Sequence, residues 1–110
     1  MTETTICAGD DVMTLINVFT VAPQRQQELV EVLIEATERV MVGMPGFVSA
    51  NIHRSDDGTH VVNYAQWRSR GDFAAMQADE RAREHMGRAA ALASFEPIVC
   101  EVVSVHHAGT

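Results

Sequence analysis

The sequence of 110 residues has no lysine, no long apolar run and only two cysteines, and each absence argues against a class of protein. All eight basic residues are arginines; the 15 acidic residues bring the formal net charge to −7. An acidic chain without a basic cluster has no surface of positive charge to bind nucleic acid or an anionic membrane. The apolar runs are too short to span a bilayer. Cys7 and Cys100 are too few for a disulfide framework.

What remains predicts one soluble, cytoplasmic domain. Apolar residues make up 46% of the chain and charged residues 21%, as in ordinary globular proteins. A chain of this length has no room for a second core. The start, MTETTICAGDD, lacks the basic and apolar parts of a signal peptide. We therefore expect a flexible N-terminal arm over residues 1–11 and a single domain over residues 12–108, with Met13 as a second candidate for the start of translation.

The apolar pattern predicts the element order β-α-β-β-α-β, with the second helix in two pieces. Proline and glycine bound the first helix, Asp57-Gly58 marks a hairpin turn, and Ser69 and Asp79 are helix caps. The predicted strands span residues 12–21, 47–54, 59–68 and 98–107, and the predicted helices span residues 23–43, 70–76 and 80–93. This order is typical of a ferredoxin-like α+β fold, an antiparallel sheet with helices on one face.

Alternation along the hairpin sorts its residues into two faces. With Arg54 opposite Thr59, the more apolar face carries Val48, Ala50, Ile52, Val61, Asn63, Ala65 and Trp67. This face is expected to meet the helices, and its two small alanines leave open volume beside Asn63. The other face carries Phe47, Ser49, Asn51, His53, His60, Val62, Tyr64 and Gln66. No helix remains to cover this second face, so the pattern predicts a homodimer packed through it.

Two asparagines stand out because asparagine is disfavoured in strands and a buried amide is costly without hydrogen bonds. Asn17 lies in LINVF and Asn63 in VVNYAQW, and Trp67 shares a face with Asn63. These three residues indicate a polar pocket; satisfied core amides and a packed indole are the alternative interpretation. His85 and Arg88 lie at the edge of the last helix's inner stripe, where they either face this pocket or form a solvated flank.

The chain shows no signature of a metal, a phosphate loop or a nucleophile paired with a base. HExxH, CxxC and two-histidine-carboxylate spacings are all missing. We therefore expect a site that uses no metal and no other cofactor.

The segment PGFVSANIHRSDDGTHVVNYAQW, in this element order, resembles the antibiotic biosynthesis monooxygenase family. Within it, the chain is most similar to small cofactor-independent anthrone oxygenases of aromatic polyketide pathways, over about residues 13–107. The resemblance implies a dimeric α+β barrel with a pocket in each subunit. It also implies a reaction in which O2 oxidises a hydroxyanthrone to a quinone. Some members have a tyrosine where Phe73 stands, and their last-helix arginine has no clean match among Arg81, Arg83 and Arg88.

The resemblance assigns roles to the pocket residues. Asn17, Asn63 and Trp67 match the family's active-site residues, so we expect these three to be catalytic. We expect the aromatic substrate to contact His85, Arg88, Phe73, Ala50 and Ala65.

Two alternative functions stay open. One is a non-catalytic or isomerase-type protein of the same fold. The other is the haem-degrading branch of the fold, for which Asn17 and His85 fit, although Met76 stands where a tryptophan is expected.

Overall fold

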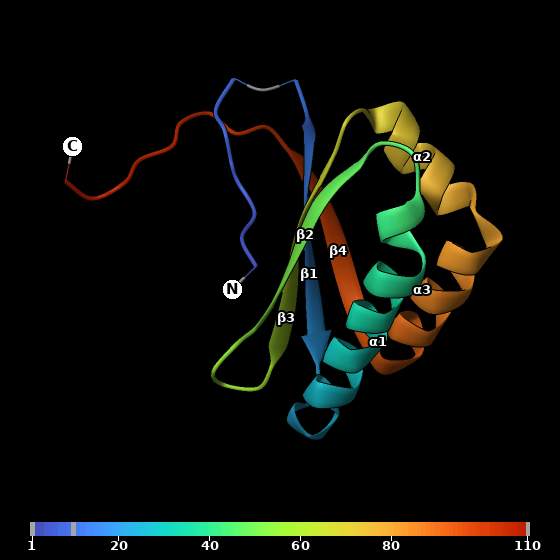
Figure 1. Ribbon diagram of the computed structural model, residues 1–110. Coiled ribbons are helices and arrows are strands. Elements are labelled where there is room, and N and C mark those ends of the chain that lie inside the picture. The colour runs from blue at the N-terminus through green and yellow to red at the C-terminus, as the bar shows by residue number, and fades with distance from the viewer. Residues whose placement is uncertain (1, 10, 110) are drawn as a thin grey trace.

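The computed structural model describes residues 2–9 and 11–109 and shows a four-stranded antiparallel sheet with all helices on one face (Figure 1). The strand order in the sheet is β2-β3-β1-β4. The elements are β1 (Met13–Val21), the 3₁₀ turn η1 (Pro23–Arg25), α1 (Gln26–Arg39), the 3₁₀ turn η2 (Met41–Gly43), β2 (Phe47–Arg54), β3 (His60–Trp67), α2 (Arg70–Ala78), α3 (Glu80–Leu92) and β4 (Ala93–Cys100). The predicted ferredoxin-like α+β fold is confirmed.

Helix caps fix where the second helical segment divides. The Ser69 side chain accepts a hydrogen bond from the backbone N–H of Asp72, which starts α2. The Asp79 carboxylate accepts from the N–H groups of Arg81 and Ala82 and starts α3. Both caps satisfy backbone donors that a helix start leaves free. The two helices therefore begin where the sequence predicts, and α2 continues two residues past Met76.

The hairpin pairs two residues away from the predicted register. Arg54 lies opposite Val61 instead of Thr59, because the turn is longer than expected. Within the turn, Asp57 accepts hydrogen bonds from the side chains of Ser55 and Thr59 and from the Thr59 N–H. These bonds hold the pKa of the Asp57 carboxyl at about 2.

A shift of two residues leaves every side chain on its predicted face, but a bulge changes the start of β2. The irregularity between Phe47 and Ser49 places Phe47 opposite Trp67, on the helix side. Val48 is exposed instead of facing the helices. The expectation for these two residues was therefore wrong, because strict alternation does not hold through a bulge.

The last strand begins and ends earlier than predicted. It covers Ala93–Cys100, so Ala93 lies in β4 and not in the helix, and Pro97 lies inside the strand opposite Asn17. An edge strand tolerates a proline because one side of its backbone needs no partner. Pairing ends at Thr14 opposite Cys100 because β1 itself begins at Met13. Residues 101–107, predicted as strand, therefore have no strand to pair with in the described part of the chain.

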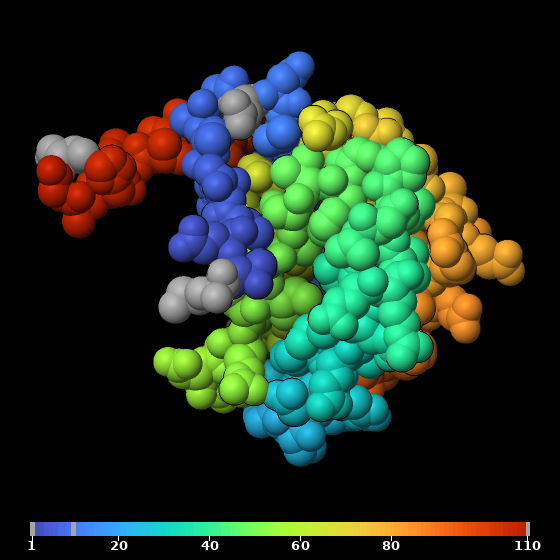
Figure 2. Space-filling view, viewed as in Figure 1, coloured from blue at the N-terminus to red at the C-terminus, as the bar shows by residue number. Residues whose placement is uncertain are grey.

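The two faces of the sheet are covered differently. The core lies between sheet and helices, whereas the N-terminal segment lies against the other face (Figure 1). There the Thr4 hydroxyl donates to the Asn51 side-chain oxygen at 2.8 Å. The C-terminal segment projects from the body (Figure 2). The predicted arm, residues 1–11, includes Met1 and Asp10, which lie outside the described residues. Within residues 2–9 and 11–109, no helix has the length and apolarity to cross a membrane.

Candidate active site

A cavity of about 240 Å³ lies between the sheet and the helices. The pairing register of β1, β2 and β3 determines which side chains form its floor. Asn17 on β1 and Asn63 on β3 are direct cross-strand partners. The next inward-facing position brings Ala65 opposite both Leu15 and Ala50. Two alanines side by side leave space above the sheet, and the two amides border that space. The sequence predicted the alanines as the source of volume, although it placed Ala50 opposite Asn63 instead of Ala65.

Aromatic side chains bound the cavity at its two ends. At one end Trp67 contacts Phe47 edge-on, with ring centroids 5.3 Å apart, and Phe73 at 6.2 Å. At the other end Phe19 and Phe95 pack with centroids 5.2 Å apart. Between aromatic ends, with amides on the floor, a flat aromatic ligand can contact rings along its length and amides along one edge.

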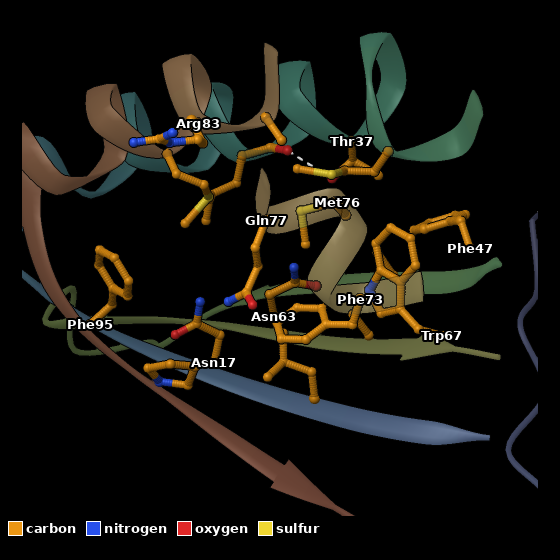
Figure 3. Close-up of a pocket in the computed structure, with 18 of the residues that line it drawn as sticks. Asn17, Thr37, Phe47, Asn63, Trp67, Phe73, Met76, Gln77, Arg83 and Phe95 are labelled. Atoms are coloured by element: carbon orange, nitrogen blue, oxygen red, sulfur yellow. Dashed lines mark hydrogen bonds between the residues drawn. The ribbon is translucent and has the colours of Figure 1, made fainter. Parts of the chain in front are cut away.

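The helices form the roof of the cavity (Figure 3). Its side chains come from all three long helices and are mostly apolar. They are Leu33, Thr37, Phe73, Met76, Gln77, Ala82, Arg83 and Met86. The Thr37 hydroxyl bonds to the Leu33 carbonyl of its own helix, so it is already satisfied. Gln77 and Arg83 make no side-chain hydrogen bond or ion pair with any residue that the structure describes.

The two floor amides are buried without partners. The Oδ1 atoms of Asn17 and Asn63 are both enclosed, and neither has a hydrogen-bond partner within residues 2–9 and 11–109. A buried polar group left unsatisfied costs roughly 1–3 kcal/mol of stability. Native structures rarely keep such a group without a reason. Both residues lie side by side and line one cavity, and their side-chain N–H groups also have no partner among the described residues, so these N–H groups are available to a ligand.

The indole of Trp67 adds a donor beside the amides. The residue is only 2% exposed and lines the same cavity. Its N–H forms no hydrogen bond with the described part of the chain. An indole N–H can only donate, whereas an amide can donate and accept. The cavity therefore offers both kinds of neutral hydrogen-bonding group and, in Arg83, one cationic side chain.

Six of the eight predicted site residues line this cavity together. They are Asn17, Asn63, Trp67, Phe73, Ala50 and Ala65. His85 and Arg88 are not among its lining residues.

His85 and Arg88 instead face α1. His85 Nδ1–H donates to the carbonyl of Arg81 at 2.9 Å, and His85 Nε2 lies 3.9 Å from a carboxylate oxygen of Glu35. The Arg88 guanidinium lies 3.6 Å from the other oxygen of Glu35. Both lie on the flank of α3 that packs against α1. Arg88 is exposed there, as the solvated-flank alternative expects, whereas His85 is largely buried and its Nε2 atom forms no hydrogen bond with the described residues. This placement also removes one of the two residues that favoured a haem-degrading site.

Sequence reasoning missed several lining residues, among them Phe95, Phe47 and Gln77. Phe95 was missed because β4 was placed too late in the chain, and Phe47 because of the bulge. The place of Gln77 could have been inferred from the sequence, since it lies four residues after Phe73 and one after the inward-facing Met76. Within the described ranges, no group of three or more histidine, cysteine, aspartate or glutamate side chains has an arrangement that could hold a metal ion.

Comparison with known proteins gives consistent matches. The model of a family described as antibiotic biosynthesis monooxygenase matches residues 12–89. A tetracenomycin-F1 monooxygenase of Streptomyces glaucescens is 51% identical over 98 residues, which cover 89% of this chain and 88% of that protein.

Two solved structures are similar in fold and sequence. The ActVA-Orf6 monooxygenase of Streptomyces coelicolor, in complex with nanaomycin D, matches with a TM-score of 0.79 and 30% identity over 86% of this chain and 90% of that one. SnoaB, a cofactor-independent oxygenase from Streptomyces nogalater, matches with a TM-score of 0.71 and 26% identity over 86% and 96%.

Proposed function

This chain belongs to the antibiotic biosynthesis monooxygenase family, and we propose that it is a cofactor-independent oxygenase that oxidises a polyphenolic, anthrone-type polyketide intermediate to a quinone with O2. The observation that carries the proposal is the pair of unpartnered amides, Asn17 and Asn63, in an otherwise apolar cavity. The 51% identity to a tetracenomycin-F1 monooxygenase supports the substrate class.

The reaction balances without an added reductant. An anthrone loses a proton from its ring CH2 group to give a carbanion, which delocalises into the phenolic rings. The carbanion passes one electron to O2, and the resulting radical and superoxide combine as a peroxide. Loss of the second C–H proton breaks the O–O bond and leaves a carbonyl. One oxygen atom of O2 is retained in the quinone, and the other leaves as water with both hydrogens of the CH2 group.

The amides and the indole stabilise the negative charge that develops on the substrate. As the carbanion forms, its charge spreads to the ketone oxygen, which becomes an enolate. The side-chain N–H groups of Asn17 and Asn63 and the N–H of Trp67 are donors that lie around one cavity. In a site with little water, one such donor stabilises a transition state by roughly 2.7–4 kcal/mol. The apolar walls exclude water that would otherwise screen the charge.

Arg83 is the cation that the cavity offers for a phenolate. It lines the roof and has no carboxylate partner among the described residues, whereas Arg88 and Arg81 contact Glu35 and Asp79. Phe73 has no hydroxyl and so cannot donate a proton to the substrate. We therefore assign substrate packing to Phe73, together with Ala50 and Ala65, and phenolate binding to Arg83.

An oxygen-balance experiment tests the function. The protein is treated with EDTA, dialysed and mixed with dihydroxyanthrone, which carries a hydroxyl on each side of its ketone. We expect one O2 consumed per quinone formed, no hydrogen peroxide, and incorporation of label from isotopic O2 into the new carbonyl. A rate no higher than that in buffer would contradict the proposal. So would activity that EDTA abolishes and added metal restores.

We also propose that the chain works as a homodimer through the sheet face opposite the helices. Ser49 and Gln66 on that face are already buried within one chain, while Asn51 and Tyr64 are half-buried. Exposed Ile98 extends the same face. Burial of Ile98 and of the Tyr64 ring against a second copy would stabilise a dimer.

Sedimentation tests the assembly. We expect twice the 12.1 kDa chain mass at micromolar concentration. Ile98→Arg is expected to dissociate the dimer, whereas Val42→Arg, at a more exposed apolar position on η2, should not. A single-chain mass for the unmodified protein would contradict the proposal.

A further inference from the structure

Gln77 is the cavity residue to which the proposed reaction gives no role. It lies one residue before the end of α2. Phe73, Met76 and Gln77 are spaced three and four residues apart, so they share one helix face. All three line the cavity. A helix face turned toward a core is normally apolar throughout. Gln77 is therefore a polar exception on an inward-facing stripe.

The Gln77 amide has both hydrogen-bonding ends free. Of the four other glutamines, three bond within the protein: Gln26 donates to the carbonyls of Ser55 and His60, Gln27 accepts from Arg54, and Gln66 donates to Thr14. The fourth, Gln24, is exposed outside the cavity and its side chain makes no hydrogen bond with the described residues. Gln77 makes no such bond in the described part of the chain. In Figure 3 its side chain points from α2 into the cavity, toward Asn17 and Asn63.

Gln77 is exposed, whereas the floor oxygens are buried beneath it. It therefore stands where a ligand enters the cavity, above the floor amides. The Oδ1 atoms of Asn17 and Asn63 can only accept hydrogen bonds, whereas the side-chain N–H groups of the same amides can only donate. A free amide above them can donate to a ketone oxygen and accept from a hydroxyl.

We propose that Gln77 is a specificity residue that selects aromatic ligands carrying a hydroxyl next to a ring ketone. Its amide donates to the ketone oxygen and accepts from the hydroxyl, on the edge that faces the floor amides. A ring system without that hydroxyl leaves one end of the amide unpaired. A site built to bond a hydroxyl rejects analogues that lack it more strongly than an apolar wall can. The inference rests on the proposed function, since it takes the cavity to be a site for polyphenols.

Binding of two unreactive quinones tests the inference without turnover. The probes are dihydroxyanthraquinone, with a hydroxyl on each side of one ketone, and unsubstituted anthraquinone. We expect Gln77→Met to weaken binding of the dihydroxy compound about tenfold, the size expected for one or two hydrogen bonds. The same change should weaken binding of the unsubstituted quinone clearly less, because that compound loses only the bond to its ketone and has no hydroxyl to lose. Gln24→Met makes the same exchange at an exposed position outside the cavity and should change neither affinity.

Each result has a defined meaning. Equal weakening of both quinones by Gln77→Met, or no weakening of either, overturns the role of Gln77 and leaves the proposed oxygenase function standing. If the protein binds the hydroxyquinone through Gln77 but consumes no O2 with the anthrone, the oxygenase function falls and the inference stands. If the unmodified protein binds neither quinone, both are overturned.

Discussion

Asn51 and Asn63 carry the same side chain on neighbouring strands but lie on opposite faces of one sheet. On the face away from the helices, Asn51 donates to the carbonyl of Tyr64 at 3.3 Å and accepts from Thr4. On the face toward the helices, the Asn63 oxygen is buried and unpartnered within the described residues, as is that of Asn17. The chain therefore satisfies the amide on one face and leaves the amides on the other face unsatisfied.

The same contrast holds for deeply buried groups. Gln66 and Thr14 are 3% and 1% exposed on the face away from the helices, and they bond to each other at 3.2 Å. Asn17 is 6% exposed on the helix face, and its side-chain oxygen has no hydrogen-bond partner among the described residues. Burial alone does not explain the difference, since both places are closed to solvent. The two asparagines border the cavity, so we infer that their amides serve a ligand, whereas the Gln66–Thr14 pair on the other face is structural.

The largest effect expected from this comparison is on catalysis. Asn63→Ala and Trp67→Phe should each lower kcat for dihydroxyanthrone by at least about tenfold, because each removes a donor to charge that appears only as the reaction proceeds. Trp67→Phe keeps most of the ring volume, so packing changes little. Steady-state O2 uptake, together with thermal unfolding, separates this loss of rate from loss of folded protein.

Asn51→Ala is the matched control because it removes the same amide from the neighbouring strand on the opposite face. We expect it to leave kcat unchanged. If Asn63→Ala and Trp67→Phe lower the melting temperature but leave kcat per folded protein intact, the two residues are structural and the cavity is not the active site.

The second effect is on stability and concerns the face away from the helices. Thr14→Val removes the acceptor of Gln66 and leaves a buried amide unpaired, which should lower the free energy of unfolding by about 2 kcal/mol. It should not alter kcat. Thr20→Val, at an exposed position on the same strand face, should cost less than about 0.5 kcal/mol. Urea denaturation measures the free energy of unfolding of both variants. Equal losses in the two variants would contradict a structural role for the Thr14–Gln66 bond.

Much of the fold could be predicted from local sequence. The two caps, the helix face of α1 and the element order follow from residue type and spacing, which act over a few neighbours. The register of the hairpin could not, because Asp57 gathers three hydrogen bonds and lengthens the turn. The extent of β4 was also misplaced, because it depends on the length of β1, far away in the sequence.

The candidate site also contains residues that the sequence could predict, and the prediction also included residues that lie elsewhere. Asn17, Asn63 and Trp67 could be found because polar residues in apolar strands are visible in the sequence, and alternation fixes their face. His85 and Arg88 lay at the edge of a helix stripe, where a rotation of a few tens of degrees decides between cavity and flank. The contact of both with Glu35 on α1 depends on how two helices pack, which spacing within one helix does not specify.

The smallest effect, on the stability of the helix face, has the opposite sign to that of Thr14→Val. Asn17→Leu replaces an amide whose buried oxygen has no partner in the described chain with an apolar side chain of similar size. Removing an unsatisfied polar group should raise the free energy of unfolding by about 1 kcal/mol. For a domain of this size, that corresponds to an increase in melting temperature of about 4–8 °C. The same change should lower kcat/KM, because the amide that is removed is the group proposed to bond the substrate, and substitutions that stabilise a functional site often reduce activity. Calorimetry and O2 uptake on one preparation measure both. A lower melting temperature would show that Asn17 bonds within the fold, and would remove the contrast between the two faces.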